Sequence, residues 1–149
     1  MTQSELDGKI LVVDFLLTSC TLTCREVNRR MAEIQQRTAH QPDVRLISLT
    51  VDPRSDTVPV LAQYGEQLGA DTNRWLLLTG DKGMLYHLIG TSFLAQGAEE
   101  DPLNYMPGNF SHTERIAIVD LSGRVRGYFN GMKEDATDAV VAEIARLRK

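Results

Sequence analysis

The stretch Ile10–Ile34 reads I-L-V-V-D-F-L-L-T-S-C-T-L-T-C-R-E-V-N-R-R-M-A-E-I, and it predicts a strand, a loop and a helix in succession. Residues 10–17 are apolar apart from Asp14. An apolar run this short is typical of a central parallel strand that is buried on both faces. Cys20 and Cys24, the two cysteines of the chain, come directly after this strand. The stretch therefore places a pair of thiols between a buried strand and a helix.

The helix is expected to begin near Cys24, because Thr23 and Glu26 fit a capping box. Its buried face is predicted from a spacing of four, three and four residues, and it carries Val27, Met31, Ile34 and Thr38. The positive end of a helix dipole lowers the pKa of a nearby thiol, and the thiolate is both a nucleophile and a metal ligand. The alternative is a pair of structural cysteines or an inert local disulfide, since C-x3-C alone is a weak motif.

Length and composition indicate one ordinary globular domain over residues 1–149. The chain is 42% hydrophobic and 24% charged, with a net charge of -4. It has no basic patch with interleaved aromatic residues, so no nucleic-acid partner is expected. No signal peptide is recognised, and no apolar run reaches the ~18 residues of a membrane span. Two cysteines in one motif favour a redox or metal pair over a disulfide framework.

The rest of the chain alternates strand and helix patterns before a closing hairpin and a last helix. Strands are predicted at 44–51, 75–78, 116–119 and 125–129, and helices at 57–68, 82–90 and 134–147. The second helix is expected to turn Val60, Leu61, Tyr64 and Leu68 inward, and the last helix Val140, Ile144 and Leu147. The segment 91–111 has no clear periodicity, and a loop of this length is usually functional or mobile.

The order β-α-β-α-β-α-β-β-α predicts an α/β fold, a three-layer sandwich with a central mixed sheet and helices on both faces. The thioredoxin-like fold has this plan. Asp14 lies six residues before Cys20 and resembles the buried aspartate that precedes the C-x-x-C motif of thioredoxins, so it is a possible proton acceptor. The alternative is an edge residue with a water partner. The spacing C-x3-C differs from thioredoxins, and His112 stands where they have a cis-proline.

Four segments together resemble the Sco/SenC family of copper-binding proteins with a thioredoxin fold. They are F-L-L-T-S-C-T-L-T-C (15–24), V-D-P-R-S-D-T (51–57), R-W-L-L-L-T-G (74–80) and S-H-T-E-R-I-A-I-V-D-L-S-G-R-V (111–125). The resemblance spans about residues 10 to 130. It departs from the family at Thr21 and Arg25, where a proline usually follows each cysteine, and at Ser111, where an aspartate usually precedes the histidine.

The resemblance implies a copper site formed by Cys20, Cys24 and His112, with one Cu(I) or Cu(II) per chain. Two thiolates and an imidazole suit a soft or borderline ion such as copper. Zinc accepts the same donors but is normally bound by four ligands. The implied role is delivery of copper, or reduction of cysteines, at the binuclear copper site of cytochrome c oxidase. The implied partner is the copper-site subunit of that oxidase, or another thiol or copper protein.

The family is usually anchored in a membrane and faces the periplasm, and this location is expected here by resemblance alone. The membrane anchor and the N-terminal hairpin of the family appear absent from the sequence, and a monomer is expected. Two alternatives stay open. One is an enzyme, a thiol-disulfide oxidoreductase of thioredoxin type without a copper role. The other is a non-catalytic binding module with an inert disulfide, so enzymatic activity is left undecided.

Overall fold

The computed structural model describes residues 8–16, 18, 23–50, 54–79, 115–122 and 125–148. Within them the elements are β1 (Ile10–Leu16), α1 (Thr23–Arg37), β2 (Val44–Thr50), α2 (Val58–Leu68), β3 (Trp75–Leu78), β4 (Arg115–Val119), β5 (Val125–Asn130) and α4 (Ala136–Leu147). These bounds agree with the predicted ones to within two residues. The helix predicted at 82–90 and the segment 91–111 lie outside the described residues. Of the described helices even the longest, α1 with 15 residues, could not cross a bilayer.

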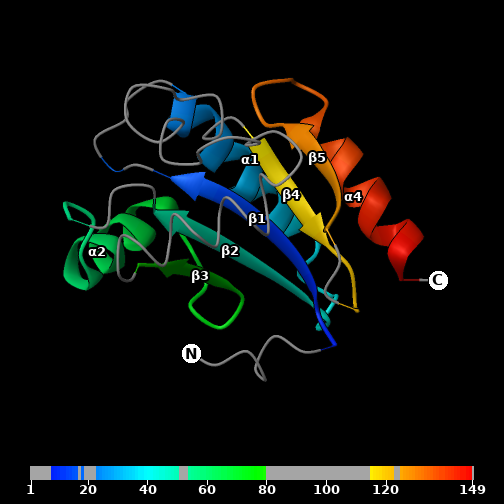
Figure 1. Cartoon of the computed structure of the whole chain (residues 1–149), viewed down its shortest axis with the longest axis horizontal. Helices are drawn as coiled ribbons and strands as arrows, with labels where there is room; N and C mark the ends of the chain where they lie inside the picture. The colour runs from blue at the N-terminus through cyan, green and yellow to red at the C-terminus, as the bar shows by residue number, and fades with distance from the viewer. Residues whose placement is uncertain are drawn as a thin grey trace, which may run out of the picture.

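The strands form one mixed sheet in the order β3-β2-β1-β4-β5 (Figure 1). β1, β2 and β3 run parallel, whereas β4 is antiparallel to β1 and β5 is antiparallel to β4. β1 is therefore the central strand, as its apolar run predicts. Because β4 runs against β1, the chain leaves β1 and begins β4 at the same edge of the sheet. We call this edge, where Leu16 and Thr50 end their strands and Arg115 begins β4, the carboxyl edge.

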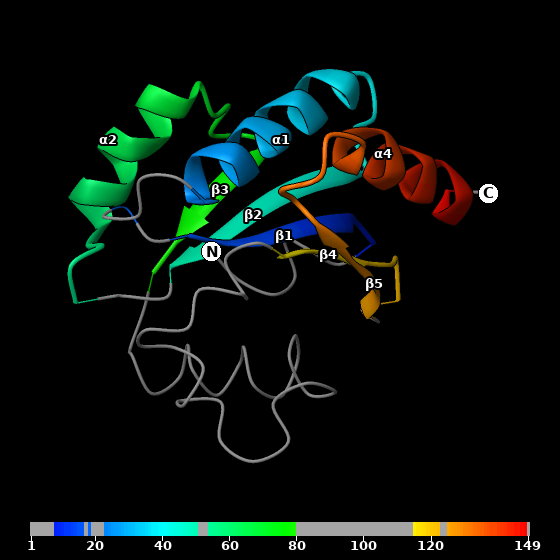
Figure 2. The ribbon, with the colours of Figure 1, turned by 90° about the horizontal axis from the view of Figure 1, so that it is seen from above.

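The three described helices α1, α2 and α4 lie on one side of the sheet (Figure 2). The predicted inward face of α1 is confirmed, since Val27, Met31, Ile34 and Thr38 are each at most 1% exposed. The hydroxyl of Thr38 donates to the carbonyl oxygen of Ile34 at 2.8 Å. Val27, Met31 and Ile34 form one core with alternate strand residues and with α4, including Ile10, Val12, Val44, Leu46, Trp75, Ile116, Ile118, Val140 and Ile144. The inward face predicted for the last helix is thus confirmed at Val140 and Ile144.

The opposite face of the sheet is buried as well. Its side chains form a second core cluster of Val13, Phe15, Ile47, Leu49, Ala117 and Val119. Both sets of alternating side chains on β1 are therefore buried, which is why its sequence is an almost continuous apolar run. The α/β class with a central mixed sheet is confirmed. Helices were predicted on both faces, and the described helices cover only one of them; the helix predicted at 82–90 is outside the described residues.

The helix α2 turns Leu61 and the half-buried Tyr64 and Leu68 inward as predicted, but not Val60. Val60, expected to point inward with Leu61, is 38% exposed, whereas Leu61 is 2% exposed. The buried side of α2 instead passes through Leu61 and Gly65. A Cβ atom at Gly65 would lie 3.5 Å from Cδ1 of Leu77 on β3, which is an ordinary van der Waals contact, so this side of the helix packs directly on the sheet. The helix ends at Gly69, whose φ of 75° forms a left-handed C-cap.

Candidate functional site

Asp14 lies in the middle of the sheet, on the face that α1 covers, and its side chain is fully buried. The hydroxyl of Ser48, its register partner on β2, donates to Oδ1 of Asp14. Nε1 of Trp75 on β3 donates in turn to Oγ of Ser48 at 2.9 Å. No described residue donates to Oδ2 of Asp14. The predicted central position of Asp14 is confirmed, and the alternative of an edge residue facing water is wrong.

The environment of Asp14 makes it a carboxyl group that titrates near neutral pH. Burial raises its pKa from 3.8 to about 7, and the hydrogen bond from Ser48 offsets part of this rise. A group with such a pKa can take up and release a proton at physiological pH, as a proton acceptor beside a thiol must. Both cysteine sulfurs lie outside the described residues, so the role of Asp14 as their proton acceptor stays a prediction.

A second buried carboxyl group, that of Asp56, connects the chain after β1 to the end of β2 at the carboxyl edge. Its Oδ2 accepts hydrogen bonds from the hydroxyl of Thr50 at 2.7 Å and from the backbone N–H of Thr18 at 3.2 Å. Its Oδ1 accepts a third bond from the hydroxyl of Thr18. Thr50 is the last residue of β2, and Thr18 stands two residues before Cys20 in the sequence. Asp56 therefore fixes the start of the segment that leads from β1 to the first cysteine.

Cys24 is the second residue of α1, which confirms the predicted position of the helix start. The backbone N–H groups of the first turn and the helix dipole make this end of α1 electropositive, an environment that favours a thiolate. The side chain of Cys24, and all of Cys20 and His112, lie outside the described residues. The described residues contain no cluster of three or more His, Cys, Asp or Glu side chains that could hold a metal ion. The three-ligand copper site thus stays a prediction.

The antiparallel pairing of β1 with β4 bears on where the predicted histidine joins the sheet. Asp14 pairs in register with Ile116, the second residue of β4. His112 precedes Arg115, the first residue of β4, by three positions in the sequence. The chain therefore comes to the carboxyl edge from His112 and leaves the same edge toward Cys20.

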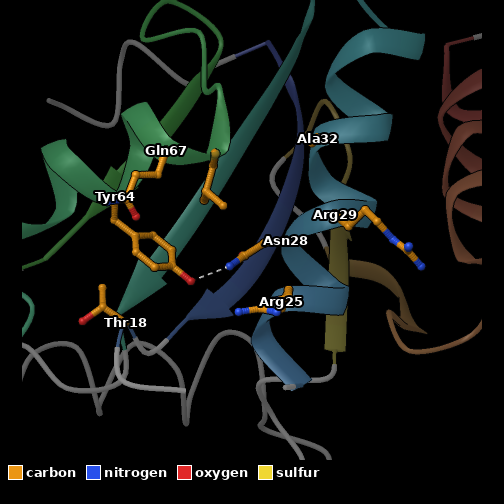
Figure 3. A pocket seen from close by; sticks show the side chains of 8 residues that line it. Thr18, Arg25, Asn28, Arg29, Ala32, Tyr64 and Gln67 are labelled. Atoms are coloured by element: carbon orange, nitrogen blue, oxygen red, sulfur yellow. Dashed lines mark hydrogen bonds between the residues drawn. The ribbon is translucent and has the colours of Figure 1, made fainter. Parts of the chain in front are cut away.

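A groove of about 450 Å³ opens between α1 and α2 (Figure 3). It is lined on α1 by Arg25, Asn28 and Arg29, on α2 by Tyr64, Gln67 and Leu68, and by Thr18 next to the carboxyl edge. Nδ2 of Asn28 donates to the hydroxyl oxygen of Tyr64 at 2.7 Å and joins the two helices across the groove. The groove thus reaches the position directly after Cys24 in the first turn of α1.

Four residues that form hydrogen bonds in this region were given no role from the sequence: Ser48, Trp75, Asp56 and Asn28. Ser48 could have been noticed in the sequence. It follows Val44 and Leu46 on one buried face of β2, and this face becomes polar at Ser48 and Thr50, toward the carboxyl edge. Asp56 belongs to the V-D-P-R-S-D-T segment and could have been noticed as a second acid after a buried strand. No sequence pattern indicates that Asn28 faces Tyr64, since their contact depends on how two helices pack.

The sequence matches the SCO1/SenC family over residues 1–149. Among curated proteins, it is similar to the SCO1 protein homolog of Bacillus subtilis (strain 168). The two are 24% identical over 142 residues, which cover 94% of this chain and 72% of that relative. The SCO2-like protein of Rickettsia felis is 28% identical over 130 residues, or 84% of this chain and 60% of that protein.

Solved structures of the family share the fold. A SCO1/SenC family lipoprotein from Bacillus anthracis str. Ames has a TM-score of 0.77 at 23% identity, covering 98% of this chain and 85% of that one. BsSco, described as a member of the Sco family of cytochrome c oxidase assembly proteins, has a TM-score of 0.76 at 22% identity, covering 96% and 82%. Bradyrhizobium japonicum ScoI, solved with copper bound, has a TM-score of 0.67 at 22% identity, covering 97% and 88%. These likenesses confirm the thioredoxin-like fold, and the match over the whole sequence shows that the chain belongs to the SCO1/SenC family.

Proposed function

We propose that this protein binds one copper ion through Cys20, Cys24 and His112, and that it serves as a copper chaperone or thiol reductase. One observation carries the proposal: β1 ends and β4 begins at the same carboxyl edge. In the sequence Cys20 follows β1 by four residues and His112 precedes β4 by three, while Cys24 is the second residue of α1. The three donors therefore flank elements that meet at one edge of the sheet.

The donor types support copper as the cargo. Two thiolates and one imidazole are soft or borderline ligands, which suit Cu(I) and tolerate Cu(II). The first turn of α1 favours the thiolate form that a metal requires. Solved relatives hold copper, including the ScoI of Bradyrhizobium japonicum. Asp14, buried beneath α1, would act as an acceptor for the protons that the thiols lose when copper binds.

Anaerobic copper titration of the reduced chain, read by absorbance and mass, tests the proposal. One equivalent should bind tightly, and Cys20→Ser or Cys24→Ser should abolish this binding. His112→Ala should weaken affinity by at least about tenfold, the usual scale for disturbing a metal site. His40→Ala is the control, because His40 is exposed and lies beyond the far end of α1. Unchanged affinity in all three ligand variants would refute the assignment.

The second candidate is a thiol-disulfide oxidoreductase, and the buried Asp14 with its near-neutral pKa favours it. One cysteine would attack a partner disulfide, and the other would resolve the mixed disulfide while Asp14 accepts the proton of the resolving thiol. His112→Ala distinguishes the two candidates, since thiol exchange needs no imidazole. If this variant binds copper normally and exchanges with a protein disulfide as fast as the wild-type chain, His112 is no copper ligand and the oxidoreductase replaces the chaperone.

The proposed partner is the copper-site subunit of cytochrome c oxidase, or another protein with reducible cysteines or a copper site. The description of BsSco as belonging to a family of cytochrome c oxidase assembly proteins supports this choice. The proposed location is on a membrane, facing the periplasm or its equivalent, and the lipoprotein from Bacillus anthracis supports it. Copper transfer from the loaded chain to a purified copper-site subunit tests the partner, and transfer without direct contact would contradict it.

A further inference from the structure

The groove between α1 and α2 contains a buried hydrogen-bond acceptor that no described residue uses. Asn28 is 2% exposed, and its Nδ2 is committed to Tyr64. Its Oδ1 accepts no hydrogen bond from the described residues. A buried amide oxygen without a donor is costly, so native proteins rarely leave one unless water or a ligand supplies the N–H. Asn28 lines the groove, and its Oδ1 is covered in the unbound chain, so a ligand donates to it once the side chain shifts toward the groove.

Among its described lining residues, the same groove has one cationic side chain without an ion pair, Arg25. Figure 3 shows Arg25 extending from the first turn of α1 on the side of Asn28 and Tyr64, whereas Arg29 points away from them. Arg29 is paired with Glu26 at 2.7 Å, but Arg25 is exposed and forms no ion pair with any described residue. None of the described residues that line the groove is acidic, although the chain as a whole has a net charge of -4. The groove is therefore a locally cationic site on an acidic protein.

The two features lie along one helix face at a spacing that suits a peptide. From Arg25 to Ala32 the helix rises about 10 Å, which about three extended residues span. A backbone N–H of such a segment can donate to Oδ1 of Asn28 while an acidic side chain pairs with Arg25. A small carboxylate alone would satisfy only the cation, and it would fill little of the 450 Å³.

We propose that the groove between α1 and α2 binds an extended acidic segment of the protein to which the cysteine pair delivers copper or electrons. The carboxylate would lie next to Arg25, beside Cys24 in the sequence, so binding would bring the partner to the thiols. The identity of this partner rests on the proposed function, but binding of an acidic peptide in the groove does not require copper.

Nuclear magnetic resonance of the ¹⁵N-labelled, copper-free full chain tests the inference. The probe is the blocked peptide Gly-Ser-Glu-Ser-Gly, and the reference is the same peptide with glutamine in place of glutamate. Shift changes should concentrate in 25–32 and 64–68. Arg25→Gln should weaken binding about fivefold, as expected for a lost charge-assisted hydrogen bond. Arg29→Gln removes the same charge four residues away and should change affinity by less than about twofold.

Each outcome decides the inference in one direction. Asn28→Leu should also weaken binding, and the glutamine peptide should bind more weakly than the glutamate peptide. Equal losses in Arg25→Gln and Arg29→Gln would overturn the inference, because they would indicate a general charge effect. Acetate that shifts the same amides at the same concentration would overturn the assignment to a peptide, and so would the absence of binding. A chain that binds the peptide but no copper would refute the proposed function and leave the groove assignment standing.

Discussion

Replacing Asp14 with asparagine should remove the part of the pH dependence of the free energy of unfolding that comes from the titration of Asp14. The carboxyl group is fully buried in the central strand, with Ser48 donating to one oxygen. Its pKa is raised to about 7 in the folded chain, above the 3.8 of an exposed aspartate. The folded state therefore holds a proton that the unfolded state has lost between these pH values. The stabilisation is complete below pH 3.8 and is lost progressively as the pH rises to about 7.

The size of the effect follows from the shift. Each unit of pKa corresponds to about 1.4 kcal/mol, so the whole change amounts to about 4 kcal/mol. Between pH 5 and pH 8 the titration crosses about two of these units. The free energy of unfolding of the wild-type chain should fall by about 3 kcal/mol more than that of Asp14→Asn over this interval. The asparagine variant should thus gain on the wild type as the solution becomes more alkaline.

Urea unfolding followed by circular dichroism, on reduced chains at pH 5, 6, 7 and 8, measures this difference. Asp135→Asn is the control, since this exposed residue precedes α4 without a capping hydrogen bond from its side chain. It should retain the wild-type pH dependence. A constant difference between wild type and Asp14→Asn across the four pH values would show that Asp14 does not titrate in this range, and the reasoning would fail.

Two further predictions concern the residues around the site. Asp56→Ala removes the acceptor of three hydrogen bonds from Thr18 and Thr50, and it should lower the free energy of unfolding in urea by about 2–4 kcal/mol. A change below about 0.5 kcal/mol would contradict the role of Asp56 in holding these residues together. Gly65→Ala should stabilise the chain by about 0.5–1 kcal/mol, because alanine favours the helix and its methyl makes an ordinary contact with Leu77. Gly69→Ala should destabilise the chain by about 1 kcal/mol, because its φ is 75°. Equal signs for the two glycine variants would exclude this explanation.

The elements were predictable from the sequence where one periodicity dominated. The apolar run of β1 and the spacing of Val27, Met31 and Ile34 each had one interpretation, and the structure buries them as predicted. Val60 was placed wrongly because Val60 and Leu61 are adjacent apolar residues on α2, and either could face the sheet. The buried side of α2 runs through Leu61 and Gly65, next to Leu77 of β3, so the packing of the helix on the strand selects Leu61. Periodicity carries no information about such packing.

For the candidate site, the sequence indicated which residues to consider but not which residues they contact. Cys20, Cys24 and His112 were selected by their chemistry and stay predictions, whereas Asp14 was selected by its position inside an apolar run, and the structure buries it. The hydrogen bonds around them join residues far apart in the chain: Asp14 to Ser48, and Asp56 to Thr18. A pattern within one element cannot indicate these pairs, because they arise from the register of β1 with β2 and from the turn after β2. Their polar residues were visible in the sequence, but their partners were not.

The two buried carboxyl groups, Asp56 and Asp14, differ in how many hydrogen bonds they accept. Asp56 accepts three hydrogen bonds from Thr18 and Thr50, so both of its oxygens are committed to holding the chain after β1 in place. Asp14 accepts one hydrogen bond from Ser48, and its Oδ2 has no donor among the described residues. That oxygen can take a proton without breaking a hydrogen bond to a described residue. Asp14 therefore has an oxygen available for the proton exchange with thiols that we propose, whereas both oxygens of Asp56 hold the start of the segment that leads to Cys20.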